Sequence, residues 1–152
     1  MSRSDPPAAP FHALVVDDDP ALQGLFSRLL SRKGFSVDAA ADGRLAYDQL
    51  NRHAYSVILL DLMMPDMDGF QVVRELRANP VTAEIPVIMI TARDDLDARA
   101  EGMRLGVSDF LAKPVFRRQL ASRVRAQLEV VETARNATAA MDRLDAVKKR
   151  SQ

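Results

Sequence analysis

The sequence of 152 residues contains no cysteine and only two histidines. The absence of thiols excludes disulfide scaffolds, thiolate zinc sites and cysteine nucleophiles, and two histidines are too few for a histidine-rich metal site. The first ten residues contain no apolar stretch that could form a signal peptide or a membrane anchor. We therefore interpret residues 1–10 as a disordered lead-in and expect a cytoplasmic protein that does not bind membranes.

The formal net charge of zero is the sum of two opposite parts. Residues 1–114 carry 12 basic and 17 acidic side chains, whereas residues 115–152 carry 9 basic and 4 acidic ones. The acidic charge of residues 1–114 and the basic charge of residues 115–152 therefore need separate explanations. The length and the hydrophobic content of 47% allow one ordinary domain with a modest extension.

Five short apolar runs alternate with helical patterns. The runs do not alternate between apolar and polar residues, which is typical of strands buried on both faces of a parallel sheet covered by helices. The order of strand and helix therefore predicts a doubly wound α/β fold. The expected strands are 13–16, 35–40, 57–60, 87–90 and 110–112, and the expected helices are 22–30, 43–52, 69–78, 95–105 and about 116–149.

Polar side chains follow four of these strands. Asp17 and Asp18 follow the first, Asp61 follows the third, Thr91 ends the fourth and Lys113 follows the fifth. In such sheets ligands bind beyond the carboxyl ends of the strands, so we expect these groups to share one edge.

Three neighbouring carboxylates repel one another and need a counter-charge. Oxygen ligands without imidazole or thiolate suit Mg²⁺, or Mn²⁺ in its place. If Asp61 accepted a phosphoryl group, its charge would become about −2, and the metal, the Thr91 hydroxyl and the Lys113 ammonium could each take one phosphoryl oxygen. The residues therefore favour Mg²⁺-dependent phosphoryl chemistry at Asp61.

Four segments together resemble the receiver domain of bacterial two-component response regulators, the CheY-like family. They are Val-Val-Asp-Asp-Asp ending at 19, Asp-Leu-Met-Met-Pro-Asp-Met-Asp-Gly from 61 to 69, Ile-Thr-Ala from 90 to 92, and Phe-Leu-Ala-Lys-Pro from 110 to 114. The match covers residues 11–130 and leaves 131–152 as a helical extension of the fifth helix.

The resemblance implies a flavodoxin-like sheet of strand order 2-1-3-4-5, with Asp61 as the phosphoacceptor. It further implies that Asp17, Asp18, Asp61 and the backbone carbonyl of Met63 hold Mg²⁺, that Thr91 and Phe110 form the switch, and that Lys113 and Pro114 are joined by a cis peptide. The implied phosphoryl donor is a phosphohistidine on a sensor histidine kinase or a histidine phosphotransfer protein. Such a chain is a signalling phosphoacceptor, not an enzyme that turns over an external substrate.

The helix expected at 95–105 is weak, because only Leu96, Ala100 and Met103 offer an apolar face and Gly102 interrupts it. We predict that Thr91 moves toward an aspartyl phosphate and frees space that Phe110 fills. The face formed by this helix, the strand at 110–112 and the last helix would then change, and it would carry partner or self association.

The last helix has no Gly or Pro after Pro114 and can also pair two subunits. Its apolar spacing suggests a weak coiled-coil seam, at Leu120, Val124, Gln127, Val131, Ala134, Thr138, Met141, Asp145 and Lys148. Residues 129–152 carry 5 basic and 4 acidic side chains, so we expect no DNA binding by this chain. We interpret His12 and His53, which have no carboxylate or hydroxyl partner at a telling spacing, as surface or packing residues.

Three alternatives stay open. The chain can be the receiver of a larger regulator cut before its effector domain, or a module of the same fold that is not phosphorylated. From another class, Asp17 and Asp19 superficially match the Asp-x-Asp motif of haloacid dehalogenase-type phosphatases, although Ala21 stands where that family has Thr or Val.

Overall fold

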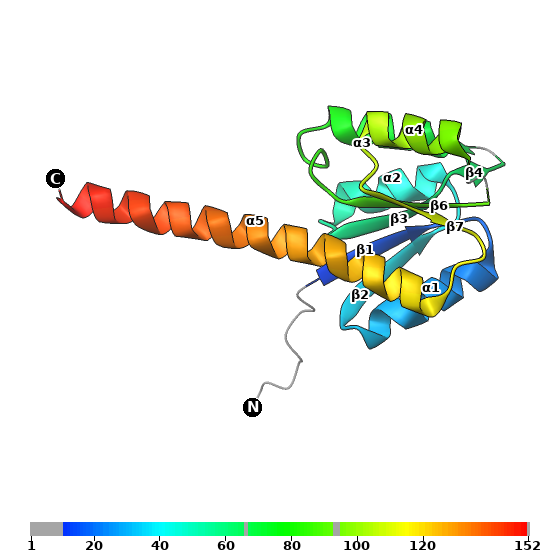
Figure 1. Cartoon of the computed structure of the whole chain (residues 1–152), viewed down its shortest axis with the longest axis horizontal. Coiled ribbons are helices and arrows are strands. Elements are labelled where there is room, and N and C mark those ends of the chain that lie inside the picture. The colour runs from blue at the N-terminus through cyan, green and yellow to red at the C-terminus, as the bar shows by residue number, and fades with distance from the viewer. Residues whose placement is uncertain (1–10, 66, 93–94, 152) are drawn as a thin grey trace.

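The computed structural model of the chain describes residues 11–65, 67–92 and 95–151, with side chains through Val147. The expected lead-in at 1–10 lies outside the described residues. Figure 1 shows a three-layer α/β body from which one long helix projects.

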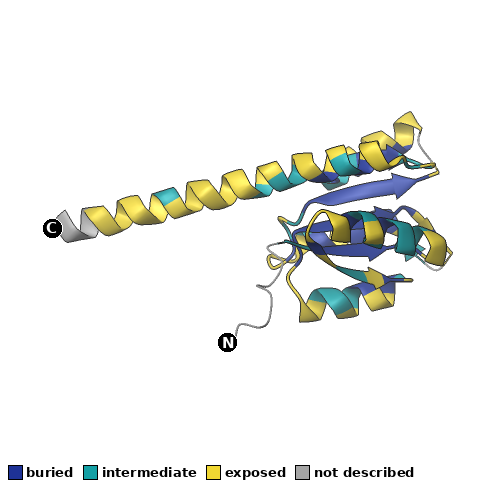
Figure 2. Cartoon of the chain, turned by 90° about the horizontal axis from the view of Figure 1, so that it is seen from below, coloured by how far each residue is buried: buried dark blue, intermediate teal, exposed yellow. Residues whose placement is uncertain are grey.

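The central sheet has five parallel strands in the order β2-β1-β3-β6-β7. This is the predicted order 2-1-3-4-5, because the two extra strands belong to a small hairpin outside the main sheet. The strands are β1 (Phe11–Val16), β2 (Phe35–Ala40), β3 (Val57–Asp61), β6 (Val87–Thr91) and β7 (Asp109–Ala112), and the hairpin consists of β4 (Met63–Met64) and β5 (Met67–Asp68). Most side chains of β1, β3 and β6 are buried, as their mainly apolar sequences predicted (Figure 2).

Helices cover both faces of the sheet, and a separate apolar core lies under each layer. α1 (Pro20–Arg32) and the first turns of α5 (Arg117–Ser151) cover one face, where Phe26, Leu30 and Leu120 are buried. α2 (Gly43–Arg52), α3 (Gly69–Ala78) and α4 (Leu96–Leu105) cover the other face. The predicted fold class is therefore confirmed.

Each of the first four helices begins after an aspartate that caps it. The carboxylate of the cap accepts a hydrogen bond from a backbone N–H in the first turn, and such a cap is worth about 1 kcal/mol. These residues are Asp19, Asp42, Asp68 and Asp95. Part of the acidic excess of the body therefore serves to start helices at fixed positions.

The predicted apolar face of α4 is wrong. Leu96 and Met103 are 85% and 63% exposed, whereas Ala98 and Gly102 are buried. The reason lies in β7, because the Phe110 ring packs directly against Gly102: a Cβ at this glycine would lie 2.5 Å from Cε2 of the ring. α4 therefore approaches the sheet through its smallest residues.

His12 is a packing residue, as expected, but it also has a carboxylate neighbour that its sequence spacing did not indicate. Its Nε2 lies 2.7 Å from Asp38 Oδ2, and its ring centroid lies 4.5 Å from that of Tyr55. The Tyr55 hydroxyl donates a 2.7 Å hydrogen bond to the same carboxylate oxygen. His53 joins the group only through ring contacts. This cluster lies near the amino end of β1, away from the edge that carries the aspartates.

α5 continues as one helix well beyond the sheet, as expected (Figure 1). Its predicted coiled-coil seam is wrong in its first half, because Leu120 and Val124 are buried under the sheet and Val131 is half-buried. Arg135 still contacts the body, with its Cζ 5.8 Å from the centroid of the Phe11 ring. Beyond this point α5 projects away from the body.

Candidate functional site

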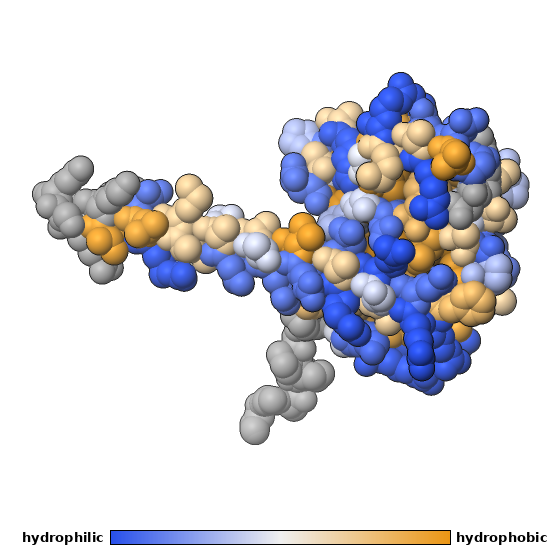
Figure 3. Space-filling model, viewed as in Figure 1, coloured by the Kyte–Doolittle hydropathy of each residue, from blue (hydrophilic) through white to orange (hydrophobic). Residues whose placement is uncertain are grey.

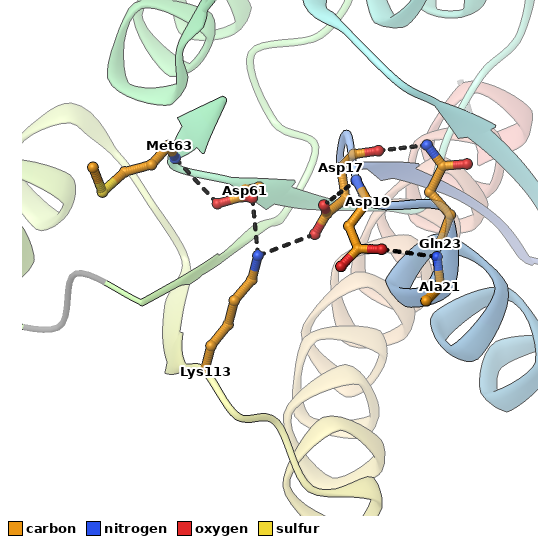
Figure 4. Close-up of polar contacts among 7 residues, drawn as sticks. All are labelled: Asp17, Asp19, Ala21, Gln23, Asp61, Met63 and Lys113. Carbon is orange, nitrogen blue, oxygen red and sulfur yellow. Dashed lines mark hydrogen bonds and ion pairs between the residues drawn. The ribbon is translucent and has the colours of Figure 1, made fainter. Parts of the chain in front are cut away.

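The carboxyl ends of four strands bring the expected residues to one edge of the sheet. Val16 pairs with Leu60, so Asp17 and Asp61 leave adjacent strands at the same level. Thr91 pairs with Ala112, which places Lys113 directly after the next strand end. Figure 4 shows the side chains of Asp17, Asp61 and Lys113 pointing toward one another.

Both carboxylate oxygens of Asp61 are held by donors. Oδ1 accepts a 3.1 Å hydrogen bond from the backbone N–H of Met63, and Oδ2 accepts a 2.9 Å bond from Lys113 Nζ. The residue is only 4% exposed. A carboxylate fixed in this way presents a defined orientation to a reactant at the edge of the sheet.

Close packing behind Asp61 explains the glycine of the motif. A Cβ on Gly69 would lie 2.8 Å from Leu62 Cα and 3.0 Å from the carbonyl oxygen of Asp61. The Gly69 N–H donates to the Leu62 carbonyl. α3 can therefore start directly beneath the loop that carries Asp61 only because residue 69 has no side chain.

Asp17 is buried at the end of β1 and is anchored on one side. Its Oδ1 accepts a 2.9 Å hydrogen bond from the Asp19 N–H, while its Oδ2 accepts none from any described residue and lies 3.4 Å from Lys113 Nζ. Burial raises the pKa of the Asp17 carboxyl, opposed by the Asp19 N–H and by Lys113. Sequence reasoning missed Gln23, whose side chain donates to the Asp17 carbonyl; no motif marks it, and only the turn of α1 brings it there.

Lys113 bridges the two carboxylates. Burial alone would lower the pKa of its ammonium, but the hydrogen bond to Asp61 and the charges of Asp61 and Asp17 leave that pKa raised. The peptide between Lys113 and Pro114 is cis, as the resemblance implied. The lysine therefore stays charged between its partners.

The carboxylates of this edge fit a hard divalent cation. One ligand oxygen from each of Asp17, Asp18 and Asp61 lies within 4.8 Å of the others, and Asp18 is exposed. Three carboxylates against Lys113 leave a local charge of −2, which a divalent ion would neutralise. The all-oxygen set suits Mg²⁺, and Oδ2 of the buried Asp17 accepts no hydrogen bond from any described residue. Met63 contributes its N–H to Asp61, and a role for its carbonyl as a metal ligand stays a prediction.

The two expected switch residues are both buried. Thr91 is fully buried at the end of β6, and Phe110 is 4% exposed in β7. The ring of Phe110 packs on Gly102 of α4 and lies 5.7 Å from Arg99 Cζ. The Phe110 ring is therefore already buried against α4 in this structure, and the movement of Thr91 stays a prediction.

Asp19, the second aspartate of the phosphatase-like motif, serves as a helix cap. Its Oδ1 accepts a 2.9 Å hydrogen bond from the Ala21 N–H and caps α1. The carboxylate that faces Lys113 and Asp17 comes from the third strand instead.

A parallel sheet of this strand order, with two buried aspartates bridged by a lysine at its carboxyl edge, is the arrangement of a CheY-like receiver. Residues 13–125 match the family model of the response regulator receiver domain. The chain belongs to this family.

Known proteins agree with this assignment. The chain is 40% identical over 119 residues to the response regulator MprA of Mycolicibacterium vanbaalenii, covering 78% of this chain and 51% of that protein. It also resembles the solved chemotaxis response regulator CheY4 of Vibrio cholerae, with TM-score 0.73, 29% identity, and 77% and 98% of the two chains covered. A putative response regulator from Chloroflexus aurantiacus gives TM-score 0.74 and 32% identity, with 79% and 98% covered.

The chain spans about half the length of the curated relatives that it matches, such as MprA and the PetR protein of Rhodobacter capsulatus. None of these matches supports the phosphatase alternative. No helix in the described part of the chain is long and apolar enough to cross a membrane.

Proposed function

We propose that Asp61 accepts a phosphoryl group from a phosphohistidine on a sensor histidine kinase or a histidine phosphotransfer protein. The observation that carries this proposal is the Asp61 carboxylate itself, held between the Met63 N–H and Lys113 Nζ beside two further carboxylates. An oriented nucleophile next to a cation site is what phosphoryl transfer needs, since catalysis there consists of positioning and charge stabilisation.

In the transfer, a lone pair of an Asp61 carboxylate oxygen forms the new P–O bond while the P–N bond to the histidine breaks. The electron pair of that bond returns to the imidazole of the donor, and Asp61 becomes an acyl phosphate of charge about −2. A bound Mg²⁺ would neutralise the phosphoryl oxygens as negative charge passes between donor and acceptor. Asp17 and Asp18, with the carbonyl of Met63, would hold it.

Lys113 and Thr91 then act on the phosphorylated residue. In this structure Lys113 Nζ donates a hydrogen bond to Asp61 Oδ2, so it is close enough to pair with a phosphoryl oxygen on that residue. The Thr91 hydroxyl donates a hydrogen bond to a second phosphoryl oxygen. Because Phe110 is already buried against Gly102, phosphorylation stabilises this packing and with it one arrangement of α4, β7 and α5. That face carries association with a partner or with a second copy.

The activity is signalling: the chain promotes its own phosphorylation and dephosphorylation in the cytoplasm. Residues 11–130 act as the receiver and 131–152 as a helical extension. We expect neither DNA nor membrane binding by this chain. The half-length match to longer regulators favours the alternative in which an effector domain belongs to the same protein.

Incubation with acetyl phosphate and Mg²⁺, followed by intact-mass measurement, tests the proposal. We expect a mass gain of one phosphoryl group that depends on Mg²⁺ and is lost in Asp61→Asn. Asp48→Asn, an exposed aspartate of α2, is the matched control and should behave as wild type. Steady phosphate release that requires Asp17 and survives Asp61→Asn would indicate a phosphatase, and no covalent product under any condition would indicate an unphosphorylated module.

A further inference from the structure

Between residues 126 and 147, α5 carries a largely exposed stripe without charge. With 100° between successive residues, a sector about 120° wide contains no charged side chain between 126 and 147. Its members are Ala126, Val130, Thr133, Ala134, Ala137, Ala140, Met141 and Leu144. Val130, Met141 and Leu144 are about 60% exposed or more, at 61%, 65% and 61%. Figure 3 shows apolar side chains on this helix outside the body.

The stripe has the spacing by which helices pair. Its central residues follow one another at steps of 4, 3, 4 and 3, the repeat that keeps a seam facing a partner helix. They are Val130, Ala134, Ala137, Met141 and Leu144. This seam differs from the one expected from the sequence, because it omits the residues that pack on the body.

The body does not obstruct this seam. Leu128 packs against the core under α1 and α5, Val131 is half-buried, and Arg135 contacts the Phe11 ring. These residues lie about 130° around the helix from the centre of the seam. A second helix can therefore lie along the seam without meeting the receiver body.

We infer that α5 pairs with α5 of a second copy of this chain, in antiparallel orientation. This deepens the association step of the proposed function. The sizes of the side chains favour this orientation. Antiparallel pairing sets Ala134 against Leu144 of the partner subunit and Ala137 against Met141 of the partner subunit. Each layer then combines one small and one large side chain, as close packing requires. In a parallel pair each residue would face its own equivalent. Two layers would then hold two alanines each, and the next two would hold two methionines and two leucines.

The charges agree with a helix as the occupant, and not with an anionic membrane surface. Between residues 126 and 147 the charged residues nearest the seam on its two sides are acidic, Glu129 and Asp145, and the nearest arginine lies further round the helix. A membrane-binding helix carries Lys and Arg along the border of its apolar face. The contact spans only four layers, so it belongs to the weak class below about 1,200 Å² and forms at high concentration.

Sedimentation equilibrium of the 152-residue chain over a wide concentration range tests the pairing. We expect reversible dimers in wild type and at least a tenfold weaker association in Leu144→Asp. Ala139→Asp is the control, because residue 139 is exposed on the opposite side of the same helix. Asp61→Asn should dimerise as wild type, which keeps this test separate from that of phosphorylation. A monomer at all concentrations, or equal loss in both helix variants, overturns the inference.

Disulfide trapping tests the orientation, and the absence of native cysteine makes it clean. Ala134→Cys and Leu144→Cys proteins, mixed with oxidised glutathione, should form a disulfide between the two variants. Each variant alone should not cross-link, because equivalent residues would lie about 15 Å apart along the antiparallel pair, beyond the 7 Å limit for a disulfide. Cross-linking of each variant with itself would show a parallel pair and overturn the proposal, and absence of any cross-link would do the same.

Discussion

The contact between Gly102 and Phe110 couples α4 to the sheet and can be probed by one methyl group. A Cβ at residue 102 would lie 2.5 Å from Cε2 of the ring and 3.4 Å from Cδ2 and Cζ. Carbon atoms normally approach to about 3.5 Å or more, so Gly102→Ala forces the ring or α4 to retreat by about 1 Å. Overpacking of this kind costs about 1–3 kcal/mol.

A second effect acts in the opposite direction. Replacing glycine by alanine inside a helix stabilises the helix by about 1 kcal/mol. We therefore expect Gly102→Ala to lower the free energy of unfolding by about 0–2 kcal/mol. Gly24→Ala provides the matched control: it lies inside α1, and its Cβ would meet only the end of the flexible Arg28 side chain, at 3.2 Å. Gly24→Ala should therefore raise the free energy of unfolding by about 1 kcal/mol.

Urea unfolding followed by circular dichroism measures both variants. The difference between them isolates the ring contact, which we expect to be about 1–3 kcal/mol. Phe110→Leu in the Gly102→Ala background should restore part of the loss, because the shorter side chain leaves room for the methyl group. If Gly102→Ala were as stabilising as Gly24→Ala, the ring would not be held against α4 and the reasoning would fail.

Three further predictions concern the cation site, the half-buried Arg77 and Tyr55. Mg²⁺ should raise the melting temperature of wild type and of Asp48→Asn, and it should raise that of Asp18→Asn clearly less. Equal shifts of the melting temperature in all three proteins would contradict a carboxylate site at the carboxyl edge of the sheet. Arg77 donates to the carbonyl oxygens of Ala83, Ile85 and Gly106. Arg77→Lys cannot reach all three and should cost about 2–3 kcal/mol in urea unfolding, whereas Arg74→Lys on the exposed side of α3 should cost little. Burial and the bond to Asp38 raise the pKa of Tyr55 above its ordinary value of 10.0. The stability this provides is present below pH 10 and is lost as the pH rises above it, so Tyr55→Phe should show a flatter decline of stability with alkaline pH than wild type; parallel curves would refute this.

The edge of the sheet that carries Asp17 and Asp61 could be predicted because the relevant signals are local in sequence. Asp17, Asp61, Thr91 and Lys113 each follow a buried apolar run, and parallel strands bring such positions together whatever the loops do. The bonds within the edge could not be predicted. The contact of Gln23 with the Asp17 carbonyl depends on the first turn of α1. The hydrogen bond from the Met63 N–H depends on a hairpin of two two-residue strands that no periodicity marks.

The sequence did not predict the buried face of α4, the buried face of α5 or the partner of His12, and each has a physical cause. Hydrophobic periodicity counts side chains, so it cannot find a face like that of α4, which packs through a glycine and an alanine. On α5 two apolar patterns overlap, and only the position of the sheet decides which one is buried. The pairing of His12 with Asp38 arises between neighbouring strands, where sequence spacing carries no information.

Because α5 is one continuous helix, a small change in its orientation at the sheet becomes a large displacement at its far end. The same 35-residue helix that begins four residues after Lys113 ends far outside the body, a length of about 52 Å. A tilt of about 5° at its first turn would displace the far end by about 4–5 Å, which is close to one helical turn. Movements too small to alter the packing of the sheet would therefore be large where the helix ends.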